Sequence, residues 1–126
     1  MKGKEQKVIL VCDDEELMRQ VAGSILERAG YEVLYAAGGV EADRIYHLHS
    51  SDIDLVLMDL SMPGDSGLDA FRRLKSFDAE VRVLFSSGFQ DDERLQIALQ
   101  EGALGFLQKP YTMERMLRMV RKYVRV

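Results

Sequence analysis

The sequence is short of cysteine and of long hydrophobic runs. Its 126 residues include a single cysteine, Cys12, which cannot form a disulfide within the chain. This fits a reducing compartment. No apolar run approaches the ~20 residues that cross a bilayer, and the first run meets Asp13 too soon for a signal peptide. These features predict a cytoplasmic protein, or a cytoplasmic part of a longer one, without membrane association.

The sequence also lacks a basic surplus, internal repeats and low-complexity segments. Lys and Arg number 17 against 21 Asp and Glu, a formal charge of −4, whereas nucleic-acid binders usually carry a basic excess. Hydrophobic residues make up 47% of the chain and charged residues 30%, which argues against disorder. We therefore expect a polar leader at 1–6 and one globular domain at 7–126, with no direct contact to nucleic acid.

Short apolar runs alternate with helical patterns along the chain. Strands are predicted at 8–12, 32–36, 54–59, 81–85 and 104–107, and helices at 15–29, 39–49, 68–77, 91–101 and 113–124. Gly30 and Gly102 are expected to end two of the helices, and Thr112 to cap the last one. Five strands and five helices in strict alternation predict an α/β fold, a parallel sheet with helices on both faces.

Apolar residues recur at helical spacing in the first and the last helix, and in the last they form one stripe. In the first helix, apolar residues recur at i+4 spacing at Leu17, Val21 and Ile25. In the last helix, the stripe comprises Met113, Met116, Leu117, Val120 and Val124.

Polar side chains that carry chemistry follow four of the predicted strands. Asp13 and Asp14 end the first strand, Asp59 the third, Ser87 the fourth and Lys109 the fifth. The carboxyl ends of parallel strands meet at one edge of a sheet, where ligands bind in open α/β folds. Adjacent strands lie ~4.8 Å apart, so we expect the three carboxylates to share one pocket.

Three carboxylates in one pocket repel each other, and at least one is expected to show a raised pKa. A Mg²⁺ ion, for which Mn²⁺ can substitute, would neutralise them with hard oxygen ligands. Lys109 adds a compact positive charge, and the Ser87 hydroxyl is a donor for a phosphoryl oxygen. Each residue alone is more often a turn former, a helix cap or a surface lysine. Together they predict metal-assisted phosphoryl transfer onto an aspartate.

These residues lie in four segments that resemble the receiver domains of two-component response regulators. The resemblance covers nearly the whole chain, and the segments occur in the order and spacing of that family: VILVCDDE, VLMDLSMPGDSGLDAF, VLFSSGF and GALGFLQKPYT. It implies a flavodoxin-like fold with strand order 2-1-3-4-5.

The resemblance also implies a role for each matching residue. Asp59 is the phosphoacceptor, and Asp14 and Asp59 bind Mg²⁺ through their side chains. Ser61 binds the ion through its backbone carbonyl, and Asp13 helps to position it, often through water. Lys109 pairs with the acceptor carboxylate and then with the phosphoryl group.

Further roles concern the switch that follows phosphorylation. The Ser87 hydroxyl would follow the phosphoryl group, and Phe106 would swing inward, although many members have Thr and Tyr there. The Lys109–Pro110 bond is typically cis in the family. Phe89 is a candidate for limiting water access to the acyl phosphate.

The resemblance implies a signalling domain that catalyses only its own phosphorylation and dephosphorylation. Its phosphoryl donor would be a sensor histidine kinase or a histidine phosphotransfer domain, and phosphorylation would switch its binding of a downstream partner. The segments SSGF and LQKPYT are more similar to receivers of hybrid sensor kinases than to those of transcription factors.

Two other functions share part of the pattern. A phosphohydrolase of the haloacid dehalogenase type needs an aspartate two positions after its nucleophile, and neither Asp13 nor Asp59 has one. A pseudo-receiver that binds partners without phosphorylation usually lacks one of the key groups, and none is missing here.

Overall fold

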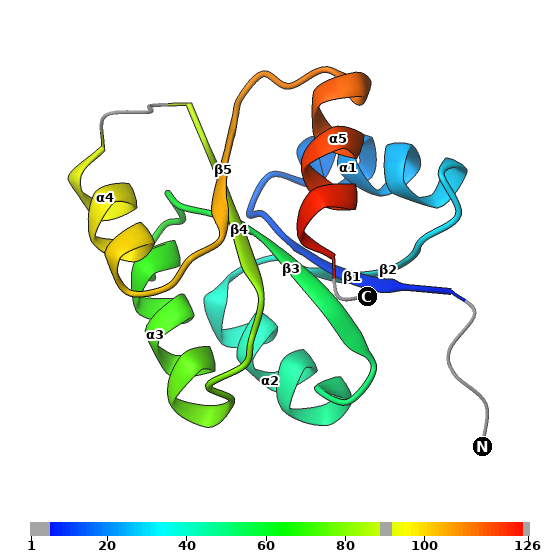
Figure 1. The fold of residues 1–126 in the computed structure, drawn as a ribbon. Helices are drawn as coiled ribbons and strands as arrows, with labels where there is room; N and C mark the ends of the chain where they lie inside the picture. Colours follow the sequence, from blue (N-terminus) through cyan, green and yellow to red (C-terminus); the bar gives the residue numbers. More distant parts are fainter. Residues whose placement is uncertain (1–5, 89–91, 125–126) are drawn as a thin grey trace.

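The computed structural model describes residues 6–88 and 92–124, over which strands and helices alternate (Figure 1). In chain order the elements are β1 (Val8–Cys12), α1 (Glu16–Arg28), β2 (Glu32–Ala36), α2 (Gly39–His49), β3 (Ile53–Asp59), α3 (Gly67–Phe77), β4 (Val83–Ser87), α4 (Glu93–Gln100), β5 (Gly105–Gln108) and α5 (Met113–Tyr123). None of the described helices has the length and apolar character needed to cross a membrane.

The five strands form one parallel sheet in the order β2-β1-β3-β4-β5, which confirms the expected fold. Helices α1 and α5 cover one face, and α2, α3 and α4 cover the other (Figure 1). The strand order reverses between β1 and β3, so the carboxyl ends of these two strands flank the crevice in which such sheets bind ligands.

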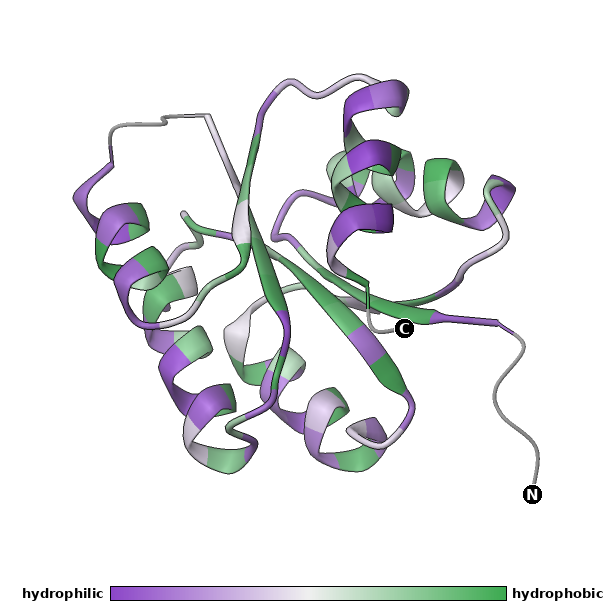
Figure 2. Cartoon of the chain, in the orientation of Figure 1, coloured by the Kyte–Doolittle hydropathy of each residue, from purple (hydrophilic) through white to green (hydrophobic). Residues whose placement is uncertain are grey.

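Every residue of β1, β3 and β4 is buried, which explains why their sequences are apolar almost throughout. Side chains alternate between two cores, as Leu10 and Val56 face α2 to α4 whereas Ile9 and Leu55 face α1 and α5. Figure 2 shows the strands as predominantly hydrophobic and the helices as mixed. The polar residues that end these strands are therefore held on a rigid apolar support.

The structure corrects the limits of β4 and α4. β4 begins two residues later than the apolar run starting at Val81, because pairing with β3 sets its register from Val83 to Ser86. α4 begins at Glu93, and the Asp92 side chain caps it by accepting a hydrogen bond from the Arg94 backbone N–H. Residue 91, where this helix was expected to begin, lies outside the described residues.

The apolar residues that recur along α1 do not mark its buried face. Leu17 and Val21 are 70% and 40% exposed, and Ile25 is partly buried against the core. The buried residues of the helix are Ala22, Gly23 and Leu26. The hydroxyl end of the Tyr35 side chain occupies the space where a Cβ atom at residue 23 would lie. Close helix-to-sheet packing therefore uses small residues, which an apolar pattern underweights.

Most of the other helix signals are confirmed. Gly30 and Gly102 follow α1 and α4 with φ angles of +100° and +112°, in the left-handed region that favours glycine. Thr112 caps α5 through a hydrogen bond from the Arg115 backbone N–H. Along the α5 stripe, Met116 and Val120 are fully buried, whereas Met113 is 55% exposed and lies outside the core.

Candidate functional site

The predicted site residues meet at one edge of the sheet, at the carboxyl ends of the strands. Asp13 follows β1, Asp59 and Ser87 end β3 and β4, and Lys109 follows β5. Asp13, Asp59 and Ser87 are at most 5% exposed, whereas Asp14 is exposed. The sheet brings together residues that lie up to 96 positions apart in the sequence.

Three carboxylates form a cluster at this edge. Asp13, Asp14 and Asp59 each offer one oxygen, and these oxygens all lie within 4.8 Å of one another. Such a set of hard, anionic oxygens suits Mg²⁺ or Mn²⁺, which bind one or two carboxylates and keep several waters. The exposed Asp14 leaves one side of the cluster accessible to solvent, as an ion that retains waters needs.

Lys109 supplies the cation on the other side of the cluster. Its Nζ atom lies 2.8 Å from Asp13 Oδ2 and 3.4 Å from Asp59 Oδ2. Burial by itself lowers the pKa of Lys109, but the hydrogen bond to Asp13 and the charges of Asp59 and Asp13 outweigh it and raise the pKa. Lys109 therefore stays charged, and it bridges the two buried carboxylates, with the shorter contact to Asp13.

The acceptor candidate Asp59 has a pKa raised to about 6. Burial is the main cause and the Asp13 charge adds to it, whereas Lys109 and the Ser61 backbone N–H lower the value. The ionised form of one carboxylate of the cluster is thus disfavoured by its surroundings, as expected for three acids in one pocket. A divalent cation would stabilise the ionised carboxylates, so both the oxygen donors and the electrostatics of the cluster fit a bound metal ion.

Two loops hold the carboxylates in place. After β1, the Glu15 backbone N–H donates to Asp13 Oδ1 at 3.0 Å, and Arg19 Nη1 donates to the Asp13 carbonyl at 2.7 Å. After β3, the Ser61 backbone N–H donates to Asp59 Oδ1 at 3.2 Å. The two bonds from backbone N–H groups fix the side-chain angles of both buried acids, and the Arg19 bond fixes the backbone at Asp13, before any ligand binds.

A close approach of α3 also shapes the loop after β3. The Gly67 backbone N–H donates to the Leu60 carbonyl at 2.8 Å. A Cβ atom at position 67 would lie 2.4 Å from the Asp59 carbonyl oxygen and 2.8 Å from the Leu60 Cα atom. Both neighbours are backbone atoms, so neither can turn aside.

We therefore expect Gly67→Ala to lower the free energy of unfolding by about 2 kcal/mol, the usual range for overpacking at a close contact. The matched control is Gly38→Ser, because a Cβ atom at Gly38 meets nothing within 4 Å and serine also caps helices. Urea unfolding of the three proteins measures the difference. Equal stability of the Gly67→Ala variant and the wild type would contradict the close approach.

The remaining predicted residues lie on β4, β5 and the loop that follows β5. Ser87 is fully buried, and its carbonyl accepts the Lys109 backbone N–H at 2.8 Å. Phe106 is half-buried against the core formed with α2, α3 and α4. The Lys109–Pro110 bond is cis, as the resemblance implies. Phe89 lies outside the described residues.

Two arginines that the sequence pattern does not single out contact the site. Arg19 lies on α1 and binds the Asp13 carbonyl. Arg94 lies on α4, and its Nη2 atom donates to Ser61 Oγ at 2.9 Å. Both look like ordinary charged positions on a helix surface in the sequence, and only the tertiary fold brings them to the strand ends.

Comparison with known proteins finds one family over most of the chain. Residues 9–121 match the model described as "Response regulator receiver domain". The chemotaxis protein CheY of Bacillus subtilis is 36% identical over 115 residues, covering 90% of this chain and 94% of that protein. The sensor kinase/phosphatase CqsS of Vibrio cholerae is 33% identical over 98% of this chain but only 18% of its own length.

Solved structures agree with these sequence matches. A response regulator receiver domain protein from Clostridium thermocellum superposes with a TM-score of 0.87 at 34% identity, covering 92% of each chain. A chain of the CheX–CheY–BeF3–Mg complex from Borrelia burgdorferi superposes with a TM-score of 0.88 at 27% identity, covering 92% of this chain and 87% of that one.

Proposed function

Because this chain belongs to the response regulator receiver domain family, we propose that it accepts a phosphoryl group on Asp59 and thereby switches its binding of a partner. The observation that carries the proposal is the arrangement around Asp59. The buried carboxylate lies beside Lys109 and within 4.8 Å of carboxylate oxygens of Asp13 and Asp14. One pocket thus holds groups that can serve as a nucleophile, a fixed ammonium group and a set of metal ligands.

In the proposed reaction, an Asp59 carboxylate oxygen attacks the phosphorus of a phosphohistidine. A P–O bond forms, the P–N bond breaks, and the electron pair stays on the imidazole nitrogen of the donor. Lys109 is close enough to Asp59 to balance the negative charge on the incoming oxygens, and Ser87 offers a hydroxyl at the end of the adjacent strand. Proximity and charge compensation carry the reaction, because phosphoryl transfer needs little other chemistry from a protein.

The residues proposed to hold Mg²⁺ or Mn²⁺ are Asp14 and Asp59 through their carboxylates and Ser61 through its carbonyl. Asp13 would orient the ion through water. When bound, the ion supplies positive charge that neutralises the carboxylates and the phosphoryl oxygens. The raised pKa of Asp59 supports this role, because an uncompensated acid in that pocket costs free energy.

The proposed phosphoryl donor is a sensor histidine kinase or a histidine phosphotransfer domain. Two similar proteins are named as a sensor kinase/phosphatase and as a sporulation initiation phosphotransferase, and both match this chain over more than 90% of its length. We propose that phosphorylation shifts an existing equilibrium of the surface formed by α4, β5 and α5, through Ser87 and Phe106. Catalysis by this chain would be limited to its own phosphorylation and dephosphorylation.

Uptake of a phosphoryl group from acetyl phosphate tests the proposal. With Mg²⁺, intact-mass measurement is expected to show one added phosphoryl group on the wild type. EDTA and the Asp59→Asn variant are each expected to abolish the uptake. Uptake that survives both controls would refute the assigned residue and metal together, and a wild type that takes up nothing would favour the pseudo-receiver alternative.

A further inference from the structure

A single guanidinium group connects α4 to the loop after β3. Arg94 Nη2 donates to Ser61 Oγ at 2.9 Å, which joins residues 33 positions apart. The same guanidinium binds both oxygens of Asp92, with Nε 3.1 Å from Oδ1 and Nη2 2.7 Å from Oδ2. Its planar fork is therefore held in one orientation by Asp92 and presents its remaining donor capacity to Ser61.

The anchor of this connection is itself fixed. Asp92 is the N-cap of α4, and its Oδ1 atom also accepts the Arg94 backbone N–H at 2.8 Å. The Asp92 side chain is 15% exposed and that of Arg94 is 39% exposed, so the pair lies against the protein surface. Arg94 therefore reaches Ser61 from a rigid helix start.

Ser61 is the residue on which the connection acts. Its backbone N–H donates to Asp59 Oδ1 at 3.2 Å, and under the proposed function its carbonyl is a metal ligand. A serine side chain is short, so a bond that fixes the Oγ atom also restricts the backbone that carries it. Holding Ser61 in place therefore holds two groups that face the acceptor site.

We infer that Arg94 is a positioning residue for the metal site: acting through the Ser61 hydroxyl, it holds the loop after β3 in the conformation that binds the divalent ion. This inference rests on the proposed function, because it takes Asp59, Asp14 and Ser61 as the metal-binding residues. It predicts that loss of the connection weakens metal binding, although Arg94 itself never touches the ion.

Simple electrostatics predicts the opposite change in Mg²⁺ affinity when Arg94 is removed. The Arg94 cation lies within electrostatic reach of Asp59, so its positive charge by itself opposes the entry of a second cation. If charge alone mattered, removal of Arg94 would tighten Mg²⁺ binding. The direction of the change therefore separates positioning from charge.

The experiment is titration of the metal-free protein with MgCl2 by isothermal calorimetry, at a temperature where circular dichroism shows every variant folded. We expect Arg94→Gln to raise the Kd for Mg²⁺ about five-fold, the size of effect of one net hydrogen bond. Arg94→Lys keeps the charge but loses the planar fork, and Ser61→Ala removes the acceptor, so both are expected to match Arg94→Gln. The double variant is expected to be no weaker than either single one.

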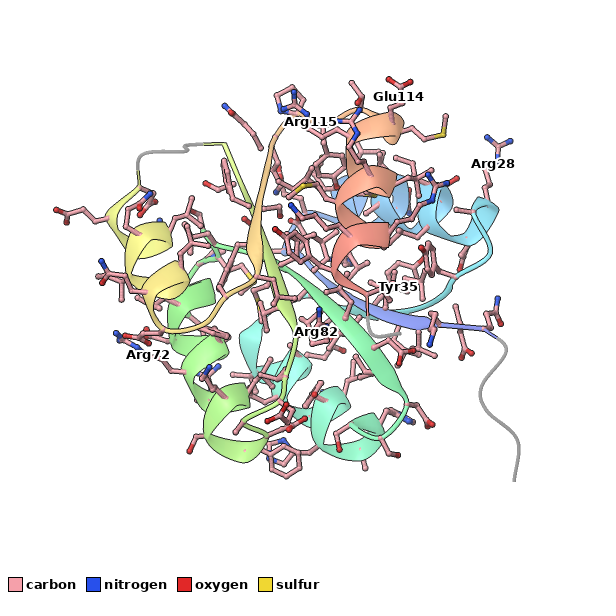
Figure 3. All side chains as sticks on the ribbon, in the orientation of Figure 1. Arg28, Tyr35, Arg72, Arg82, Glu114 and Arg115 are labelled. Atoms are coloured by element: carbon pink, nitrogen blue, oxygen red, sulfur yellow. The ribbon has the colours of Figure 1, made fainter. Side chains whose placement is uncertain are left out.

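Arg72→Gln is the matched control. Arg72 lies at the surface of α3 and forms an equally close pair with Glu101, without contact to the strand ends (Figure 3). This variant is expected to leave the Kd unchanged. As a second readout, phosphoryl uptake by Arg94→Gln is expected to fall at low Mg²⁺ and to recover at saturating Mg²⁺, which a general loss of stability would not produce.

Each result has one meaning. The positioning role would be overturned by unchanged or tighter Mg²⁺ binding in Arg94→Gln, or by wild-type affinity in Arg94→Lys. It would also be overturned if the fold-increases in Kd of the two single variants multiplied in the double variant. None of these results would affect the proposed function. A wild type that binds no Mg²⁺ would instead contradict the proposed function itself.

Discussion

The metal-free Asp59→Asn variant is expected to be more stable than the wild type at pH 7, by roughly 2 kcal/mol. Burial and the Asp13 charge raise the pKa of Asp59 to about 6, so the ionised form is disfavoured in the folded protein. The difference from the ordinary value near 3.9 corresponds to about 3 kcal/mol, and solvent at the open edge of the site screens part of it. An amide removes the charge while nearly keeping the shape of the side chain.

The size of this stability difference depends on pH. Between about pH 4 and pH 6 the folded protein binds more protons at Asp59 than the unfolded chain does, so wild-type stability falls as the pH rises through this window. Below about pH 4 the carboxyl is protonated in both states, and the contribution vanishes. We therefore expect the two proteins to have similar stability at pH 3.5 and to diverge towards pH 7.

Urea unfolding in EDTA at several pH values measures this difference. Asp69→Asn is the control, because Asp69 is an exposed carboxylate on α3 outside the cluster. Addition of Mg²⁺ is expected to stabilise the wild type and to narrow the gap to Asp59→Asn. An Asp59→Asn variant that is no more stable than the wild type at pH 7 in EDTA would mean that the folded protein does not disfavour the ionised form of Asp59.

Replacement of Lys109 by methionine is expected to slow phosphoryl uptake by roughly 10²- to 10³-fold, the cost of removing one preorganised donor from such a site. The ammonium group is the one described cation in contact with both Asp13 and Asp59. Without it, neither of the two buried carboxylates has an ion pair with another side chain among the described residues. The same change is expected to lower the free energy of unfolding by about 2 kcal/mol, because it removes one partner of a largely buried ion pair.

Initial rates of uptake from acetyl phosphate at saturating Mg²⁺ separate the two effects of Lys109→Met, provided that the variant is folded at the assay temperature. Lys122→Met serves as the control, since Lys122 is exposed on α5 and packs over the ring of Tyr123. It is expected to behave as the wild type. A Lys109→Met variant with an undiminished rate would show that the ammonium group takes no part in the reaction.

Much of the fold follows from the pattern of strands and helices. Continuous apolar runs predicted β1 and β3 correctly, because both lie inside the sheet and are buried on both faces. The exposed Leu17 and the small residues Ala22 and Gly23 show where such patterns fail. A helix that approaches a sheet closely buries small side chains, so its most apolar residues need not mark its inner face.

The candidate site was likewise predictable only in part. Strand ends placed Asp13, Asp59 and Lys109 at one edge, because parallel strands leave no other arrangement. The contact from Arg94 to Ser61 was not predictable, since it depends on where α4 starts and on the rotamer of a long side chain. Local sequence carries no signal for such a contact between distant elements.

Locating the phosphoryl group on the protein decides whether Asp59 is the acceptor. Protein treated with acetyl phosphate and Mg²⁺ is reduced with borohydride, which converts an aspartyl phosphate to homoserine, and peptides are sequenced by tandem mass spectrometry. Asp59 as the phosphoacceptor predicts homoserine at position 59 and at no other aspartate. Homoserine at position 13 or 14, or an unmodified position 59 in protein that carries the group, would contradict it.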